Sequence, residues 1–182
     1  MSFEFITPRL RIRPWTATDR SALARLTGDA DMMRFISDGQ PWSDDRLDEL
    51  IARIDTHLEA HGVAFGALER RDDGEVLGLA GLQRLDGGDF ELGWWVWKDF
   101  WGQGLAVEAA RPFIDHAREV MGLGRLVAVI DEDNAASRRV AEKLGLMFEC
   151  TKSARETMAI RPDSPIAFYA MDLSQTGSAS RG

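Results

Sequence analysis

Hydrophobic positions recur along the chain with two different periods, which predict strands and helices that alternate. Residues 3–13 alternate apolar with basic side chains, a pattern typical of a half-exposed strand. From Ser43 to Gly62 apolar side chains return every three or four positions, which predicts a helix capped by the serine and ended by the glycine. The same patterns predict short helices over 19–27 and 31–36, a hairpin over 63–85, a strand over 125–130, a helix over 135–144 capped by Asn134 and closed by Gly145, and strands over 146–151 and 166–173.

The stretch from Phe90 to Met121 is the centre of this pattern. It begins with a strand over 90–97 that is rich in aromatic residues, passes Gly102 and Gly104, and continues as a helix with one apolar face. The first amides of a helix have no partner inside it, and glycine allows a close approach of the backbone, so such a turn can bind an anion. A turn that merely joins the strand to the helix fits the same residues.

Glycine-rich phosphate motifs narrow the choice of ligand. The dinucleotide pattern G-x-G-x-x-G fails because Val107 takes the place of its third glycine, and no mononucleotide P-loop string is present. Pro112 lies inside the predicted helix, where proline removes a hydrogen bond. We therefore expect a kink there, or a helix that begins later.

Composition bounds the class of protein. The chain has 182 residues, 45% hydrophobic and 29% charged, and fits one domain over 1–173 with a disordered tail over 174–182. No apolar run is long enough to span a bilayer, no signal peptide is evident, and the single Cys150 suits a reducing cytoplasm. The net charge of −8 argues against broad nucleic-acid or anionic-membrane binding and leaves cationic partners open.

Four blocks of sequence together resemble one branch of the GNAT superfamily of N-acetyltransferases, the ribosomal-protein-serine/alanine (RimJ/RimL-like) branch. The blocks are Thr7-Pro-Arg-Leu-Arg-Ile-Arg13, Glu91-Leu-Gly-Trp-Trp-Val96, Trp101-Gly-Gln-Gly-Leu-Ala-Val-Glu-Ala-Ala110 and Asn134-Ala-Ala-Ser-Arg-Arg-Val-Ala-Glu-Lys-Leu-Gly145. The resemblance implies the α/β GNAT (acyl-CoA N-acyltransferase) fold, in which a mixed, mostly antiparallel sheet splays at its central strand and is flanked by helices. It also implies a bulge in that strand.

The resemblance implies acetyl-CoA as the cosubstrate, with no metal. Pantetheine would pair with the central strand like an added strand, and the glycine turn would hold the pyrophosphate, with tryptophan in place of the usual glutamine or arginine. Asn134 would be either a helix cap only or a cap that also contacts pantetheine, and both can hold at once because its amide has spare donors. The cofactor-binding residues expected on this basis are Trp95, Val96, Trp97, Trp101, Gly102, Gln103, Gly104, Leu105, Ala106, Asn134 and Ser137.

The catalytic candidates follow from the chemistry of acyl transfer to an amine. Something must accept a proton from the amine, and the departing thiolate needs a hydrogen-bond donor. The resemblance favours Glu91 as the base, with Glu156 as the alternative, and Ser137 as the donor. Ser137 could instead serve only as a residue of the first helical turn. The single tyrosine, Tyr169, lies in the last predicted strand rather than in that helix.

The acceptor is the least determined part of the function. The acidic composition and the loop Asp131-Glu132-Asp133 favour a cationic primary amine, such as a peptide N-terminus, a polyamine or an aminoglycoside-like molecule. Alternatives are a non-catalytic acyl-CoA-binding or sensor domain and a nucleotide-binding regulatory domain. His57 and His61 share a helix face, but two ligands make a weak metal site. The family and the tryptophan-rich strand predict a homodimer.

Overall fold

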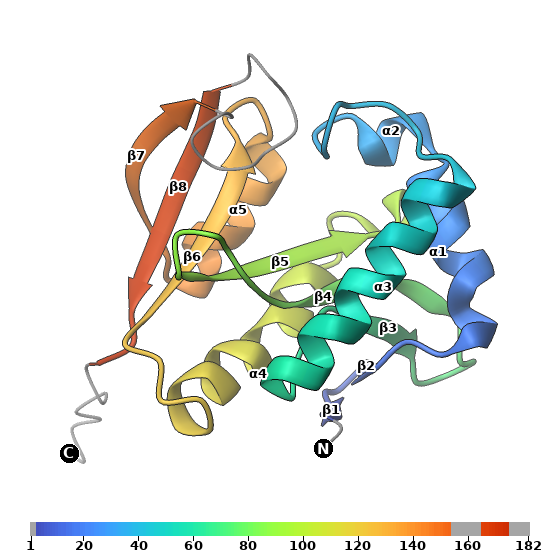
Figure 1. The fold of residues 1–182 in the computed structure, drawn as a ribbon, viewed down its shortest axis with the longest axis horizontal. Helices are drawn as coiled ribbons and strands as arrows, with labels where there is room; N and C mark the ends of the chain where they lie inside the picture. Colours follow the sequence, from blue (N-terminus) through green and yellow to red (C-terminus); the bar gives the residue numbers. More distant parts are fainter. Residues whose placement is uncertain (1–2, 154–164, 175–182) are drawn as a thin grey trace.

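The computed structural model describes residues 3–153 and 165–174, and these form one eight-stranded sheet with helices on both faces (Figure 1). The strand order is β1-β2-β3-β4-β5-β6-β8-β7. The strands are β1 Phe5–Ile6, β2 Leu10–Arg13, β3 Gly66–Arg70, β4 Val76–Arg84, β5 Phe90–Val96, β6 Arg125–Asp131, β7 Met147–Ser153 and β8 Pro165–Asp172. The helices are α1 Arg20–Thr27, α2 Ala30–Met33, α3 Asp44–His61, α4 Leu105–Glu119 and α5 Ala135–Leu144, with short 3₁₀ turns η1 Ala17–Asp19 and η2 Lys98–Phe100.

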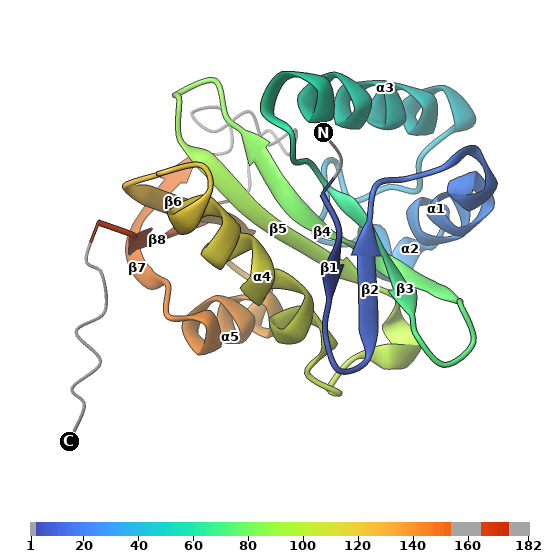
Figure 2. The same cartoon turned by 90° about the horizontal axis from the view of Figure 1, so that it is seen from below.

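Two apolar clusters hold the layers together. Figure 2 shows α4 and α5 on one face of the sheet and α1 and α3 on the other. The larger cluster joins Leu92 of β5 to Ala109 and Phe113 of α4, and the smaller one joins Leu79 of β4 to Leu50 of α3. The alternation of side chains along β4 and β5 therefore supplies both faces of the sheet with core residues.

The first predicted strand is wrong in one respect, because the chain turns within it. Phe5 pairs with Ile12 and Ile6 with Arg11, so β1 and β2 form an antiparallel hairpin. The backbone N–H of Thr7 donates to the carbonyl of Leu10 at 2.9 Å, and the hydroxyl of Thr7 accepts the N–H of Leu10, which closes the turn. Pro8 lies in the turn and cannot donate to a ladder, so a continuous strand is disfavoured there.

The helix boundaries confirm the capping predictions. The side chain of Ser43 accepts the N–H of Arg46 at the start of α3, and Gly62 ends that helix with φ of 73°. Gly145 likewise ends α5 with φ of 93°. Both glycines lie in the left-handed region that other residues adopt at a cost.

α4 begins at Leu105 and continues through Pro112 to Glu119, so the expectation of a later start is wrong. Pro112 has no N–H to donate to the carbonyl of Glu108, four residues earlier. The apolar face of the helix compensates, because Ala109, Phe113 and Ala117 are fully buried against the sheet.

The sheet opens between β5 and β6. β5 pairs antiparallel with β4 through seven residue pairs, from Gly78↔Val96 to Arg84↔Phe90, but it meets the parallel strand β6 at the single pair Glu91↔Val127. β6 then pairs with β8 through seven residue pairs of its own. The predicted mixed, mostly antiparallel sheet that splays at its central strand is confirmed. We call this divergence of β5 from β6 the fork (Figure 1).

The bulge expected in the central strand is not found in β5. Its register with β4 is continuous along the whole strand, and the register shifts lie between Ala67 and Glu69 in β3 and between Phe148 and Cys150 in β7. Donors that face the fork must therefore come from the ordinary alternation of a strand.

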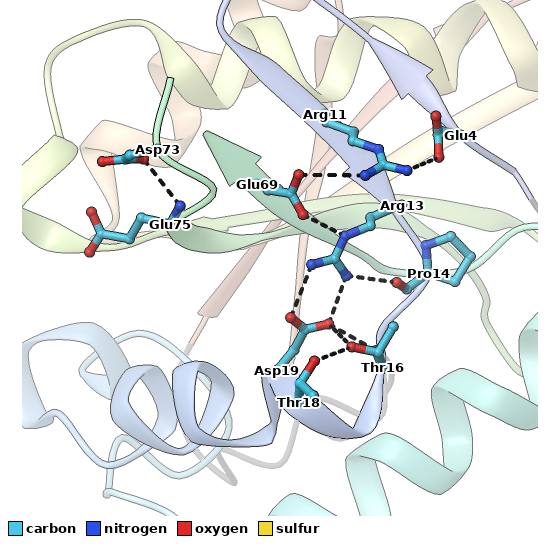
Figure 3. A network of polar contacts seen from close by, with 10 residues as sticks. All are labelled: Glu4, Arg11, Arg13, Pro14, Thr16, Thr18, Asp19, Glu69, Asp73 and Glu75. Carbon is cyan, nitrogen blue, oxygen red and sulfur yellow. Dashed lines mark hydrogen bonds and ion pairs between the residues drawn. The ribbon is translucent and has the colours of Figure 1, made fainter. Parts of the chain in front are cut away.

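A polar network fixes the N-terminal hairpin to the start of α1 (Figure 3). Arg13 of β2 donates to both oxygens of the buried Asp19, at 2.7 and 3.0 Å, and to Glu69 of β3 at 2.7 Å. Burial alone would raise the pKa of the Asp19 carboxyl, but hydrogen bonds from Arg13 and Thr16 outweigh it and hold the pKa below its ordinary value. Asp19 is therefore kept ionised inside the protein by its partners.

We expect Arg13→Gln to lower the free energy of unfolding by about 3 kcal/mol, because it leaves the buried carboxylate of Asp19 without its cation. Urea unfolding at neutral pH measures the change. Arg11→Gln is the matched control on the same strand, since Arg11 pairs with Glu4 and Glu69 in an exposed setting. That control should lose less than about 1 kcal/mol. Equal losses in the two variants would contradict the structural role given to Arg13.

Candidate active site

The edge of β5 that faces the fork carries backbone groups that no strand pairs. The N–H of Trp97 donates to the carbonyl of Leu77 at 2.7 Å, so Trp97 faces β4. Because backbone direction alternates in an antiparallel ladder, Trp95 and Gly93 also face β4, whereas Trp94 and Val96 face the fork. β6 has diverged by this point, so an extended ligand can pair with the free edge as an added strand.

This geometry redistributes the predicted pantetheine contacts. Val96 offers its N–H to the fork, but its carbonyl already accepts the indole N–H of Trp101 at 2.6 Å. Trp95 and Trp97 direct their backbone toward β4, and Trp94, which the sequence analysis did not select, faces the fork instead. Successive residues of a strand direct their backbone N–H and C=O groups to opposite sides. A difference of one residue therefore decides whether a residue faces β4 or the fork, and the family resemblance alone could not determine which residues pair with pantetheine.

The glycine turn leads into an open helix terminus. Gly102 and Gly104 have φ of 76° and 78°, in the left-handed region, and no side chain caps α4. An added Cβ at Gly102 would meet nothing within 4 Å. The amides of Leu105 and Ala106 at the start of α4 are therefore available to an anion, which the helix dipole also favours.

Three residues around this turn were missed by the sequence analysis as site residues. Thr7 and Arg9, in the β1–β2 turn, contact Glu108 in the first turn of α4: the Thr7 hydroxyl at 2.6 Å and the Arg9 Nε at 2.7 Å. Arg9 also donates from Nη1 to the carbonyl of Gln103 at 3.0 Å. Thr7 and Arg9 lie in one of the four blocks that carried the family resemblance, and Glu108 lies in another. The presence of these residues in the matched blocks was the signal that the sequence offered.

Glu91 lies at the point where the fork begins. Its carboxylate accepts a hydrogen bond from Nε2 of Gln83, directly opposite on β4, and another from the backbone N–H of Val129 on β6. Burial raises the pKa of the Glu91 carboxyl to about 7, although both hydrogen bonds act in the opposite direction. A carboxylate with a pKa near neutrality is suited to accept a proton.

The first turn of α5 supplies the other predicted contacts. Asn134 accepts the backbone N–H of Ser137 through Oδ1 at 3.1 Å, which confirms the predicted cap. The amide N–H groups of Asn134 remain as possible donors to a ligand. Among the described residues no hydrogen bond involves the hydroxyl of Ser137. Its backbone serves the cap, and its hydroxyl does not.

Tyr169 has a structural environment. It is buried, and its hydroxyl accepts the Nε–H of Arg138 at 3.0 Å, which ties β8 to α5. A tyrosine in this setting is not free to serve a leaving group. Glu156, the alternative base, lies outside the described residues, as does the tail beyond residue 174.

The same face of β5 that carries Glu91 also carries Trp95. The ring of Trp95 lies edge-on to that of Trp42 at 5.9 Å, in the segment between α2 and α3. Nε1 of Trp42 is buried and has no partner among the described residues. Trp94 packs into the larger cluster on the opposite face. Trp94 and Trp95 therefore lie on opposite faces of β5.

The histidine pair is engaged in the fold. Nδ1 of His57 lies 2.8 Å from the carbonyl of Val63, and its Nε2 accepts the N–H of Arg84 at 2.9 Å. Within residues 3–153 and 165–174 no group of three or more His, Cys, Asp or Glu side chains could hold a metal ion. No helix in that part of the chain is both long and apolar enough to cross a membrane.

Comparison with known proteins gives a family match over most of the chain. Residues 9–147 match the model of the acetyltransferase (GNAT) domain. The chain is 31% identical to YkkB of Bacillus subtilis over 170 residues, which cover 91% of this chain and 94% of that protein.

More distant relatives have described activities. A spermidine N(1)-acetyltransferase of Escherichia coli is 24% identical over 147 residues, covering 77% of this chain and 74% of that protein. The structure of RimL, a ribosomal L7/L12 alpha-N-protein acetyltransferase in complex with coenzyme A, superimposes with a TM-score of 0.76 at 17% identity, covering 92% of this chain and 96% of RimL. The resemblance to the RimJ/RimL-like branch is thus confirmed at the level of the fold.

We expect Glu91→Gln to stabilise the protein in a pH-dependent way. The pKa of Glu91 is about 7 in the folded protein against an ordinary value of 4.5, so the protonated form contributes stability that is complete below pH 4.5 and lost as pH rises to 7. The free energy of unfolding of the wild type should fall by about 1–3 kcal/mol relative to the variant across that window and then run parallel to it. Urea unfolding between pH 4.5 and pH 8 measures this.

Glu119→Gln, at an exposed position of α4, is the control for the loss of one carboxylate. If the difference in the free energy of unfolding between wild type and Glu91→Gln does not change with pH, the pKa of the Glu91 carboxyl is not raised in the folded protein, and this part of the site description is wrong.

Proposed function

Because the chain belongs to the GNAT acetyltransferase family, we propose that it transfers an acetyl group from acetyl-CoA directly to a primary amine, either a peptide N-terminal α-amine or a small-molecule amine. The observation that carries the proposal is the fork. It sets the free edge of β5 beside the open N-terminus of α4 and places Glu91, with its pKa near 7, at its base. The edge of β5 can pair with an extended ligand, the N-terminus of α4 can bind an anion, and Glu91 can accept a proton.

The residues present fit acetyl-CoA in chemical type. The unpaired backbone of Trp94 and the N–H of Val96 suit the two amide groups of pantetheine. The α4 amides after Gly104, at Leu105 and Ala106, suit the pyrophosphate. The indole N–H of Trp101 donates to the carbonyl of Val96 and so connects the glycine turn to the end of β5. This hydrogen bond restricts the position of the pyrophosphate site relative to the pantetheine site.

The chain then needs to move one proton and stabilise one leaving group. The amine nitrogen attacks the thioester carbonyl carbon, the C–N bond forms and the C–S bond breaks. Glu91 accepts the amine proton, directly or through water, and the hydroxyl of Ser137 donates a hydrogen bond to the departing thiolate. The hydroxyl of Ser137 has no hydrogen-bond partner in the described part of the chain, which supports this role, because the Asn134 cap uses only the backbone N–H of Ser137.

The alternative is a non-catalytic acyl-CoA-binding domain with the same fold. Such a domain would need the binding site for acetyl-CoA but not a base with a raised pKa. The position of Glu91, and relatives named as N-acetyltransferases, favour the catalytic function. Release of free thiol from acetyl-CoA in the presence of a panel of amines separates the two functions, since only the enzyme releases it with turnover.

We expect Ser137→Ala to lower kcat by about 10²-fold, the lower end of acid–base contributions, with little change in KM for acetyl-CoA. Steady-state thiol release measures both constants. Ser43→Ala, which removes the cap hydroxyl of the remote helix α3, is the control and should leave kcat unchanged. A Ser137→Ala enzyme with full kcat would reduce Ser137 to a residue of the helix start.

The acceptor is proposed to be cationic before it reacts. The net charge is −8, and Glu132 and Asp133 lie at the end of the β6 arm of the fork. Asp131 is buried and accepts the N–H of Asp133, so it shapes this loop rather than attracting ligands. The relatives include a spermidine acetyltransferase and a protein N-terminal acetyltransferase, both of which act on amines. A peptide α-amine has the lower pKa and so loses its proton more readily.

A homodimer in the cytoplasm remains part of the proposal. The support from tryptophan is weaker than the sequence suggested, because Trp94 and Trp95 pack against the two apolar clusters. Trp101 is the tryptophan that is more than half exposed.

We expect kcat/KM for an N-terminal peptide and for spermidine to fall as ionic strength rises, because salt screens attraction between an acidic surface and a cation. In a Glu132→Gln/Asp133→Asn variant, kcat/KM should be lower at low salt and less dependent on salt. Glu119→Gln/Asp115→Asn, on α4, controls for net charge. If the best acceptor reacts equally well under all conditions, acidic steering at this loop is wrong.

A further inference from the structure

The guanidinium of Arg9 lies against the turn that leads into α4. Its Nη1 donates to the carbonyl of Gln103 at 3.0 Å, inside the glycine turn. Its Nη2 is the nearest atom to the position that a Cβ at Gly104 would occupy, at 3.9 Å. A cation from the N-terminal hairpin is therefore held beside the amides that are open to an anion.

Glu108 fixes Arg9 in this position. Its Oε2 accepts from Nε and lies 2.7 Å from Nη2, and its Oε1 accepts the backbone N–H of Arg9 at 2.8 Å and the hydroxyl of Thr7 at 2.6 Å. Burial alone would raise the pKa of the Glu108 carboxyl, but these hydrogen bonds hold it below its ordinary value. Two guanidinium nitrogens of Arg9 meet one carboxylate oxygen of Glu108 while the backbone N–H of Arg9 binds the other oxygen, so the orientation of both groups is restricted.

Arg9 retains donors for a ligand. Of its five N–H bonds, Glu108 and Gln103 use three, and the other two have no partner within the described residues. The side chain is 49% exposed, against 14% for Glu108. The accessible part of this ion pair is thus its cationic part.

The charge of Glu108 explains why the cation matters here. A carboxylate in the first turn of a helix interacts well with the helix dipole, but it would repel a phosphate bound at the same terminus. Pairing with Arg9 cancels that repulsion and leaves two N–H donors at the edge of the turn. Without the cation, the open amides of α4 would be followed by an unbalanced negative charge.

We propose that Arg9 is a phosphate-binding residue of the coenzyme A site, held against the glycine turn by Glu108 and Thr7. This inference rests on the proposed function, and it adds a side-chain cation to a site otherwise built from backbone amides. It also gives the β1–β2 hairpin a part in cofactor binding.

Calorimetric titration of the protein with coenzyme A and with 3′-dephospho-CoA tests this directly. We expect Arg9→Gln to weaken coenzyme A binding about tenfold, which corresponds to about 1.4 kcal/mol, and to reduce its dependence on salt. Arg9→Lys should recover part of the affinity, since it keeps the charge but loses the fork-shaped donor group. An equal loss for both ligands assigns the contact to the pyrophosphate, and a loss for coenzyme A alone assigns it to the 3′-phosphate. Either result supports the proposal.

Arg71→Gln is the matched control. Arg71 carries the same charge as Arg9 and supports the β1–β2 turn, in which Arg9 lies, by donating to the carbonyls of Thr7 and Pro8. It should change affinity less than twofold. If Arg9→Gln and Arg71→Gln weaken binding equally, Arg9 acts only by supporting the turn, and the proposal is wrong. Unchanged affinity in a folded Arg9→Gln protein also overturns it, while wild-type binding leaves the proposed function standing. Absence of binding in the wild type contradicts the proposed function itself.

Discussion

The single contact between β5 and β6 is the constraint on which the rest of the site depends. Seven residue pairs join β5 to β4 and seven join β6 to β8, so each arm of the fork is hydrogen-bonded along its length to a neighbour of its own. Between the arms only Glu91↔Val127 pairs. Backbone groups left open in this way normally find a partner, and an extended ligand that carries amides can provide one.

Glu91 has its chemical character because of where the strands part. At this position a side chain faces the protein interior and also the N–H of Val129, which has no β5 backbone opposite it. Burial raises the pKa of the carboxyl, while Gln83 and Val129 keep the carboxylate oriented. The divergence that leaves the edge of β5 unpaired is thus also the place where a carboxyl group has a pKa near neutrality.

The N-terminal hairpin has two tasks that are separate in space. Through Arg13 it is bound to the buried Asp19 and so to the start of α1. Through Thr7 and Arg9 it is bound to Glu108 and so to the start of α4. Alternate arginines on one short segment therefore tie the hairpin to two different helices, Arg13 to the start of α1 and Arg9 to the start of α4.

Much of the fold could be predicted from the sequence because its signals are local. Ser43 and Asn134 accept the amides that their helices leave open, Gly62 and Gly145 adopt the φ that ends a helix, and the period of apolar residues set most of the boundaries. Family resemblance supplied the sheet and its opening. The turn at Pro8 was missed, because Phe5 and Ile12 still alternate as one strand would across it.

The site could be predicted only in part, because its remaining features depend on register and long-range contact. Whether Trp94 or Trp95 faces the fork is decided by the pairing of Trp97 with Leu77. The pKa of Glu91 depends on burial by distant elements, and the partnership of Arg9 with Glu108 spans 99 positions of the chain. No local pattern contains that information.

Amide hydrogen exchange, followed by NMR with and without coenzyme A, tests the central claim that the fork and the N-terminus of α4 together form one coenzyme A binding site. In the free protein the N–H groups of Trp94 and Val96 should exchange faster than those of Gly93 and Trp95, which are bonded to β4. Coenzyme A should slow exchange at Trp94, at Val96 and at residues 105–107 together. Bound coenzyme A that leaves these amides unprotected, or protects only one of the two regions, would contradict the account.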